Sequence, residues 1–395
     1  MRLVNEAEVA GKRVLLRVDF NVPVADGKVT DDTRIRAVLP TIRYLIDNRA
    51  RVVVIAHQGR PGGEGYERAY TLAPIAYTLG KLLKQDVRLT HDILGKQTTA
   101  DVAALADGEV LMLENLRFDA REKSCDREFA RRLAELADVF VNDAFAAAHR
   151  AHASITGVTE FLPSYAGFLM NKELGAFERM LAMPAHPFVA ILGGSKVSDK
   201  IKVIDKLIEV VDVLIIGGAM CFTFLQTQGY SVGASLREED WVGPAKDLLE
   251  KARERGVTFL LPIDFVIASE VSAEAETAIC DIATGIPEGK MGLDIGPATV
   301  KLYQQAIAEG RTVFWNGPMG VFELASFADG TRQVATAVAM NSSAVTIIGG
   351  GDSIAAINKF GYNDLVTFIS TGGGAALELL EGRQLPGVAA LKGTL

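Results

Sequence analysis

Short apolar runs alternate with amphipathic segments along the first part of the chain. Four runs, at residues 14–20, 52–56, 110–113 and 139–141, are expected strands because they are apolar almost throughout. Between them, apolar residues recur at helical spacing in 40–47, 72–84 and 127–137. Strands that are buried along their length and alternate with helices are typical of a mainly parallel sheet covered on both faces.

The same rhythm returns in the second half, after a change of pattern. Residues 162–187 hold apolar positions mostly at helical spacing, and prolines bracket them, so we expect one long helix that connects two domains. Apolar runs then resume and include expected strands at 344–348 and 366–369. We therefore predict an α/β chain with two doubly wound, mainly parallel-sheet, Rossmann-like domains at 1–165 and 186–379, joined by an interdomain helix or hinge at 166–185.

Composition and charge narrow the class of protein. The 395 residues include 38 glycines and only three, widely spaced cysteines, which favours a globular protein without disulfides or a zinc site. Residues 1–165 hold 23 basic and 23 acidic side chains, and the remainder holds 18 and 26, so the net charge of −8 lies in the second half. This balance disfavours a nucleic-acid partner. No signal-like N-terminus or membrane-length apolar stretch is found, so we expect a cytoplasmic protein without a membrane partner.

Charged and polar side chains follow each of the four expected strands of the first half. They are Asp19 and Asn21, then His57 and Arg60, then Glu114 and Arg117, then Asn142, Asp143, His149, Arg150 and His152, with Arg34 nearby. One such arginine would be read as a surface cation, but parallel strands bring all of them to one edge of the sheet. Because arginine is suited to bidentate capture of phosphate and carboxylate, a small, multiply anionic ligand is expected there. The two histidines beside Arg150 could bind a metal, add donors for the same anion, or be structural.

Clustered glycines follow five expected strands of the second half. The turns read ILGGSKVSDK from Ile191, IIGGAM from Ile215, FWNGPMG from Phe314, IIGGGDS from Ile347 and FISTGGGA from Phe368. Unhindered N–H groups at a helix start form a phosphate cradle. Lys196 and Lys200 are either phosphate contacts or solvated helix residues. Asp352 is either a helix N-cap or first-turn partner of the helix dipole, or a ligand of the Mg²⁺ that accompanies a nucleoside polyphosphate.

An edge suited to a polyanion and a second edge suited to a nucleotide together suggest phosphoryl transfer between their ligands. That reaction needs in-line positioning, cations against the spreading charge and exclusion of water, but little covalent participation. The chain has no GxxxxGK[ST], no GxGxxG with a later ribose acid, and no kinase HRD and DFG set. A nucleotide sensor without activity, another acyl-phosphate-forming kinase and a nicotinamide dehydrogenase are the alternatives.

Eight motifs together resemble the phosphoglycerate kinase family. They are RVDFNVP from Arg17, AHQGRP from Ala56, NDAFAAAHRAH from Asn142, GGSKVSDKI from Gly193, GLDIGP from Gly292, WNGPMGVFE from Trp315, IIGGGDS from Ile347 and STGGGAALELLEG from Ser370. The resemblance implies reversible phosphoryl transfer from 1,3-bisphosphoglycerate to MgADP, giving 3-phosphoglycerate and MgATP in glycolysis. It also implies direct transfer on domain closure without a covalent enzyme intermediate, a monomer, and a tail, 380–395, that returns to the first domain.

The resemblance also implies roles for individual residues. The phosphoglycerate would be held by Asp19, Phe20, Asn21, Arg34, His57, Gln58, Gly59, Arg60, Arg117 and Arg150. The nucleotide would be held by Lys200, Gly292, Asn316, Glu323, Gly350, Gly351, Asp352 and Ser353, with Asp352 linked to the metal. The catalytic groups would be Arg34, Lys196, Lys200, Gly373 and Gly374, with Gly372 beside them.

Five positions depart from the pattern expected of the family. They are Gln58, Ala146, Ser195, Ala219 and Ala298. None of the five removes a charged group with an implied role. Ala146 and Ala219 add a methyl group where backbone is expected near a ligand, which bears on substrate affinity rather than on the reaction.

Overall fold

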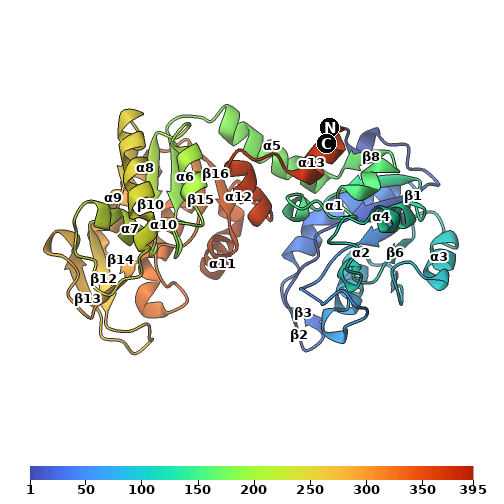
Figure 1. Cartoon of the computed structure of the whole chain (residues 1–395), viewed down its shortest axis with the longest axis horizontal. Coiled ribbons are helices and arrows are strands. Elements are labelled where there is room, and N and C mark those ends of the chain that lie inside the picture. Colours follow the sequence, from blue (N-terminus) through green and yellow to red (C-terminus); the bar gives the residue numbers. More distant parts are fainter. Residues whose placement is uncertain (395) are drawn as a thin grey trace. The chain divides into compact units, whose positions relative to one another are not determined.

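A computed structural model describes residues 1–394 of the chain. The chain divides into two compact units, the first made of Met1–Gly175 and the segment that begins at Gln384, the second of Ala176–Arg383. Each unit holds a six-stranded sheet in which every pair of neighbouring strands is parallel (Figure 1). The predicted α/β class with two mainly parallel sheets is confirmed.

The first sheet has the strand order β5-β6-β4-β1-β7-β8. Its strands are β1 (Arg13–Arg17), β4 (Arg51–Ile55), β5 (Val87–Leu89), β6 (Val110–Met112), β7 (Val139–Asn142) and β8 (Ser164–Ala166). The four strands expected from the apolar runs, β6, β4, β1 and β7, are consecutive neighbours in this order. Their C-terminal ends therefore lie side by side at one edge of the sheet.

Helices cover both faces of the first sheet, because successive strand residues point to opposite sides. Val14 and Leu16 of β1 pack with α1 (Thr33–Asp47) and α2 (Ala73–Leu83) in one core cluster. Leu15, between them, packs with α3 (Lys96–Ala103) and α4 (Arg127–Ala134) in the other. A short hairpin of β2 (Val24–Ala25) and β3 (Lys28–Val29) lies between β1 and α1.

Two sequence-predicted boundaries in this unit are wrong. The expected helix at 40–47 begins seven residues earlier, at Thr33, so that Pro40 lies inside α1 rather than at its start. Its buried residues are spaced at helical intervals from Ile35 onward, which is why the helix continues through the proline. The expected strand at 14–20 ends at Arg17.

The second unit repeats the plan with the strand order β11-β10-β9-β15-β16-β17. Its strands are β9 (Phe188–Leu192), β10 (Val213–Ile216), β11 (Thr258–Leu260), β15 (Thr312–Asn316), β16 (Val345–Gly349) and β17 (Phe368–Ile369). Its helices are α6 (Ile201–Leu207), α7 (Cys221–Thr227), α8 (Val242–Glu254), α9 (Pro297–Glu309), α10 (Asp329–Met340), α11 (Gly351–Phe360) and α12 (Gly374–Leu380). A further antiparallel sheet of β12 (Asp264–Ala268), β13 (Ala278–Asp281) and β14 (Met291–Ile295) was not predicted.

Two helices bear on the domain organisation. The helix α5 (Phe168–Ala182) contains the point, after Gly175, at which the first unit gives way to the second. The final helix, α13 (Pro386–Lys392), packs on the first unit, where the Gly387 N–H donates to the Ala148 carbonyl at 2.8 Å. Of the expected tail at 380–395, residue 395 lies outside the described residues. Within residues 1–394, no helix has the length and apolar character needed to cross a bilayer.

Candidate active site

The polar residues that follow the strands of the first sheet gather at its C-terminal edge. We call this group the arginine edge, and it consists of Asp19, Asn21, Arg34, His57, Arg60, Arg117 and Arg150. Asp19 and Asn21 follow β1, His57 and Arg60 follow β4, Arg117 follows β6 and Arg150 follows β7. Arg34 arrives from the first turn of α1. Four neighbouring parallel strands thus supply the group through the loops that leave them.

Among the residues of the arginine edge, all of which the structure describes, Asp19 and Arg34 form the one ion pair. Nη1 of Arg34 donates to Oδ2 of Asp19 at 2.5 Å, and the Asp19 side chain is nearly buried whereas that of Arg34 is 34% exposed. The carboxylate therefore orients the guanidinium group of a side chain that is still partly exposed. Such an arginine can bind an incoming anion without having to be ordered first.

The backbone of Gly59 joins two more residues of the arginine edge. Asn21 accepts the Gly59 N–H at 3.0 Å, and Nη1 of Arg117 donates to the Gly59 carbonyl at 2.6 Å. Gly59 has a φ of +63°, and an added Cβ would lie 2.4 Å from the Tyr70 ring, so only glycine fits here. Nε of Arg117 is buried and has no hydrogen-bond partner among residues 1–394. An unpartnered buried donor of this kind fits a site whose ligand supplies the acceptor.

The electrostatics of the arginine edge favour neutral histidines and anionic ligands. Burial, followed by the charges of Arg17 and Arg117, holds the pKa of His57 well below its ordinary value. The same causes lower the pKa of His152 to about 4. Both rings are therefore uncharged at neutral pH. Within the part of the chain described, no group of three or more His, Cys, Asp or Glu side chains could hold a metal ion.

The remaining predicted residues of the first unit play different parts. The Phe20 side chain is fully buried in the core, so only its backbone could meet a ligand. Gln58 uses its amide to accept the Val22 N–H and to donate to the Val22 carbonyl, which joins the loops after β1 and β4. Arg60 is exposed.

Sequence reasoning missed a buried group beneath this edge. Arg17, Glu122 and Ser154 are each at most 1% exposed and are joined by hydrogen bonds. A charged residue at the end of the apolar run of β1 was a usable signal for Arg17. Glu122 lies in a polar stretch before α4, where nothing in the sequence distinguishes a buried carboxylate from a solvated one.

In the second unit, Lys200 is the most constrained of the predicted residues. It is the N-cap of α6, and its Nζ donates to the Gly193 carbonyl at 2.6 Å and to the carbonyl and Oδ1 of Asn316, both at 2.7 Å. Burial lowers the pKa of Lys200 to about 8, although Asp352 and Asp199 oppose the shift. The turn after β9 and the end of β15 are thus joined by one ammonium group.

The turn between β16 and α11 lies beside Asn316, which is bonded to Lys200. Gly350 has a φ of +85°, and an added Cβ would lie 3.0 Å from Nδ2 of Asn316, a buried donor without a partner among residues 1–394. The Ser353 hydroxyl is buried and accepts the Gly317 N–H at 2.5 Å. Gly351 and Asp352, in the first turn of α11, are exposed. The helix therefore begins with an open N-terminus and one carboxylate.

A cavity of about 350 Å³ brings three more predicted residues together. Gly292, Glu323 and Asp352 all line it, with Phe222 and Phe265 on its apolar wall. An added Cβ at Gly292 would lie 2.4 Å from the Phe222 ring, so the glycine lets that ring pack against β14. Apolar walls with a few polar groups at the rim are typical of a small-molecule site.

The other glycine turn and Lys196 lie apart from this cavity's lining. Gly373 has a φ of +52° and precedes α12, whose first residue, Gly374, is exposed. Gly372 donates its N–H to the Ser370 hydroxyl at 3.1 Å. Lys196 is exposed.

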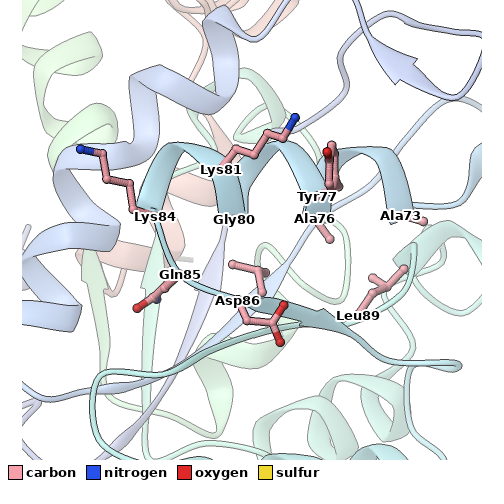
Figure 2. A pocket seen from close by; sticks show the side chains of 10 residues that line it. Ala73, Ala76, Tyr77, Gly80, Lys81, Lys84, Gln85, Asp86 and Leu89 are labelled. Atoms are coloured by element: carbon pink, nitrogen blue, oxygen red, sulfur yellow. The ribbon is translucent and has the colours of Figure 1, made fainter.

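A larger cavity in the first unit holds none of the predicted residues. It measures about 550 Å³ and lies between α2 and β5 (Figure 2). Figure 2 shows the Lys81 and Lys84 side chains pointing away from the strand, and Nζ of Lys81 lies 4.4 Å from the centre of the Tyr77 ring. These cations do not converge on the cavity, so it is not an anion site of the kind found at the arginine edge.

The chain is similar to known proteins along almost its whole length. A family model described as phosphoglycerate kinase matches residues 4–383. Phosphoglycerate kinase of Roseiflexus sp. (strain RS-1) is 54% identical over 392 residues, 99% of this chain and 98% of the relative. That of Thermosipho africanus is 50% identical over 390 residues, 98% of this chain and 97% of the relative. The structure of phosphoglycerate kinase from Coxiella burnetii has a TM-score of 0.90 at 42% identity, covering 99% of this chain and 98% of that one.

Proposed function

The chain belongs to the phosphoglycerate kinase family and catalyses its glycolytic phosphoryl transfer, and from that premise we propose which residues carry the reaction. The reaction would be the reversible transfer of a phosphoryl group from the acyl phosphate of 1,3-bisphosphoglycerate to MgADP, giving 3-phosphoglycerate and MgATP. The observation that supports the assignment of sites is the position of the arginine edge in one unit and the glycine turns in the other.

The phosphoglycerate would bind at the arginine edge. Arg60, Arg117 and Arg150 would hold its non-reacting phosphate and carboxyl oxygens, since guanidinium groups match both in a bidentate manner. Asp19, Asn21, His57 and the backbone at Phe20, Gln58 and Gly59 would fix the orientation of the molecule. The unpartnered Nε of Arg117 supports this, because a bound oxyanion would give it an acceptor.

The nucleotide would bind in the cavity of the second unit. The rings of Phe222 and Phe265 suit the flat apolar faces of a base, Gly292 allows it to approach β14, and Glu323 can accept hydrogen bonds from the ribose hydroxyls. The polyphosphate would then lie toward Gly350, Gly351 and Ser353 at the start of α11. Backbone N–H groups and the positive end of the helix dipole stabilise phosphate at such a position.

Asp352 would hold the Mg²⁺ that accompanies the nucleotide. Mg²⁺ is usually bound by one or two carboxylates together with phosphates and water, and an exposed carboxylate that lines the nucleotide cavity fits that demand. When bound, the ion would neutralise charge on the nucleotide phosphates. The two readings of Asp352 are compatible, because it also lies in the first turn of α11.

The protein groups would act on the charge that builds in the transition state. Arg34, oriented by Asp19, would neutralise the oxygens of the transferring group. Lys196 and Lys200 would contact the phosphates, and Gly373 and Gly374 would offer N–H groups to the same oxygens. No side chain is required as a covalent carrier.

Closure of the two units would bring the substrates together. Direct transfer needs the reacting atoms about 3–3.5 Å apart, and each unit carries the proposed groups for only one substrate. Closure would also exclude the water that could hydrolyse the acyl phosphate. The protein would act as a monomer in the cytoplasm.

A coupled assay with ADP and 1,3-bisphosphoglycerate, with and without Mg²⁺, tests this assignment through Arg34→Ala. We expect kcat to fall by roughly a hundredfold or more, because the lost cation acts chiefly as charge develops. The affinity for nucleotide should stay unchanged, since Arg34 lies in the first unit.

The matched control is Arg36→Ala. Arg36 lies two residues further along α1, is exposed and, within residues 1–394, forms an ion pair with Asp32 alone, so its loss removes the same charge from the same helix. Wild-type turnover is expected for this control. Retention of turnover by Arg34→Ala would remove Arg34 from the catalytic groups.

A further inference from the structure

A buried chain of hydrogen bonds runs beneath the arginine edge and ends at His57. The Ser154 hydroxyl donates to Oε1 of Glu122 at 2.6 Å, and the Ser154 N–H donates to Oε2 at 3.0 Å. The same hydroxyl accepts Nε–H of Arg17 at 2.9 Å. The carboxylate thereby fixes Ser154 by both of its oxygens, and Ser154 fixes the guanidinium group.

Arg17 in turn determines which nitrogen of His57 carries the proton. Nη2 of Arg17 lies 3.0 Å from Nδ1 of His57. A guanidinium group can only donate, so Nδ1 must be the acceptor and the proton of the neutral ring resides on Nε2. No residue in 1–394 accepts that proton, which leaves Nε2–H available to a ligand.

Charges near Glu122 and near His57 act on the two ends of this series of hydrogen bonds. Glu122 faces Arg17, Arg117 and His152, whose Nδ1 is 3.7 Å from its Oε1. His57 faces Arg17, Arg117, Arg150 and His152. A buried guanidinium group without a nearby carboxylate would be strongly destabilising, and Glu122 supplies that carboxylate from a different segment of the chain.

We propose that Glu122 is a positioning residue for substrate binding, which holds Arg17 through Ser154 so that His57 presents Nε2–H to an anionic oxygen of the phosphoglycerate. The inference rests on the proposed function, which places His57 in the substrate site. It adds that the form of the His57 ring is set by a carboxylate two hydrogen-bonded residues away.

Glu122→Gln is the direct test, because it keeps the size of the side chain. The Ser154 hydroxyl and N–H bond to different oxygens of Glu122, and in glutamine one of these two positions becomes an NH₂ donor, so both bonds cannot be kept as they are and the negative charge near Arg17 is lost. Arg17 would then be held by the Val18 carbonyl but less firmly by Ser154. The ring should lose its single protonated form, and KM for 3-phosphoglycerate should rise roughly tenfold, as for a lost hydrogen bond to a charged ligand. The kcat should change much less, since the bond serves binding.

The ring itself can be observed in the free enzyme by ¹⁵N NMR of histidine-labelled protein. The chain has five histidines, so the ring signals can be assigned by single substitutions. In the wild type, Nδ1 of His57 should be the unprotonated nitrogen and Nε2 the protonated one. Glu122→Gln should mix the two forms, and Ser154→Ala, which removes the relay but keeps the carboxylate, should do the same.

Glu114→Gln is the matched control for the ring signals. Glu114 is also a buried carboxylate of the first unit, but it accepts from Thr71, the Leu72 N–H and the Asn115 N–H rather than from Ser154. It should lose stability on substitution while the His57 signals stay as in the wild type. If Glu114→Gln changes them equally, a general loosening of the unit explains the effect and the inference fails.

The two readouts separate this inference from the proposed function. Unchanged His57 signals in Glu122→Gln would overturn the inference whatever the kinetics. Changed signals with a raised KM support it. Changed signals with an unchanged KM would overturn its link to the substrate and would also remove His57 from the proposed site. In a His57→Ala background, Glu122→Gln should add no further increase in KM.

Discussion

Burial disfavours the charged form of Lys200 in the free protein. Three oxygens surround the ammonium group, yet burial still lowers its pKa to about 8. The folded chain therefore binds fewer protons at this lysine than the unfolded chain between about pH 8 and its ordinary pKa of 10.5. The contribution of Lys200 to the free energy of unfolding consequently rises with pH across that window.

The pH dependence of turnover should report this lysine. Lys200 is charged below about pH 8 and neutral above it, so we expect kcat/KM for nucleotide to fall as pH rises through about 8. Steady-state kinetics between pH 6 and 10 would measure the decline. In Lys200→Met the activity should be low and this limb should be absent.

Lys202→Met provides the comparison for that experiment. Lys202 lies in the same helix, two residues further on, and is exposed. It should keep both the turnover and the decline of the wild type. A decline that persists in Lys200→Met would assign the titration to another group.

Residue types at strand ends carried most of the information on the candidate site. Arg117 and Arg150 were proposed because charged residues follow apolar runs, and they follow β6 and β7, the outer two of four consecutive strands in the first sheet. Arg17 and Glu122 were missed because the partner of a buried charge is chosen by the tertiary fold. They lie more than a hundred residues apart in the sequence, and no local sequence pattern predicts their interaction.

At the scale of elements, the geometry of the turn between β16 and α11, the proposed phosphate-binding turn, requires glycine. Gly349 ends the strand and Gly351 begins the helix, and Gly350 between them has a left-handed backbone. A side chain there would meet Asn316 at the point where its buried amide has no partner. The turn is thus restricted both by its φ and by the space beside it.

Gly350→Ala should separate these two restrictions when it is compared with Gly256→Ala. Both glycines have positive φ, at +85° and +71°, so both variants should lose about 1 kcal/mol of stability. Only Gly350 has a neighbour within 3.0 Å, whereas nothing lies within 4 Å of an added Cβ at Gly256. Nucleotide affinity, measured by calorimetry, should fall only in Gly350→Ala. Equal affinities in the two variants would contradict a role for this turn in binding.

The elements that the sequence predicted poorly have physical reasons. The expected helix at 40–47 omits the part of α1 before Pro40, a residue that is normally excluded from a helix interior. The helical spacing of Ile35, Val38, Leu39 and Ile42 was the stronger signal, because burial of that face outweighs one missing hydrogen bond. The antiparallel sheet of the second unit escaped prediction because β13 is short and mostly exposed.

At the scale of the whole molecule, the two proposed substrate sets belong to different compact units. The alternation of strands and helices was enough to predict two such units, because it needs only local periodicity. Their motion is a matter of energetics that periodicity does not encode, so the closure proposed above needs a measurement in solution.

Small-angle scattering tests closure directly. The radius of gyration should be smaller with a nucleotide and 3-phosphoglycerate together than with either ligand alone. Only the two ligands together would favour the closed state, because each unit binds one of them. The samples with one ligand are the controls for effects of binding itself. An equal radius in all samples would argue against closure as part of the reaction.

The return of α13 to the first unit has a consequence for synthesis on the ribosome. The second unit is one continuous stretch and can finish folding as soon as it emerges, whereas the first waits for the segment after Gln384. Until then, the surface around Ala148 lacks the helix that covers it, and Ala148 is two residues from Arg150. The unit that is translated first is therefore completed only by the last segment of the chain, next to the loop that carries Arg150.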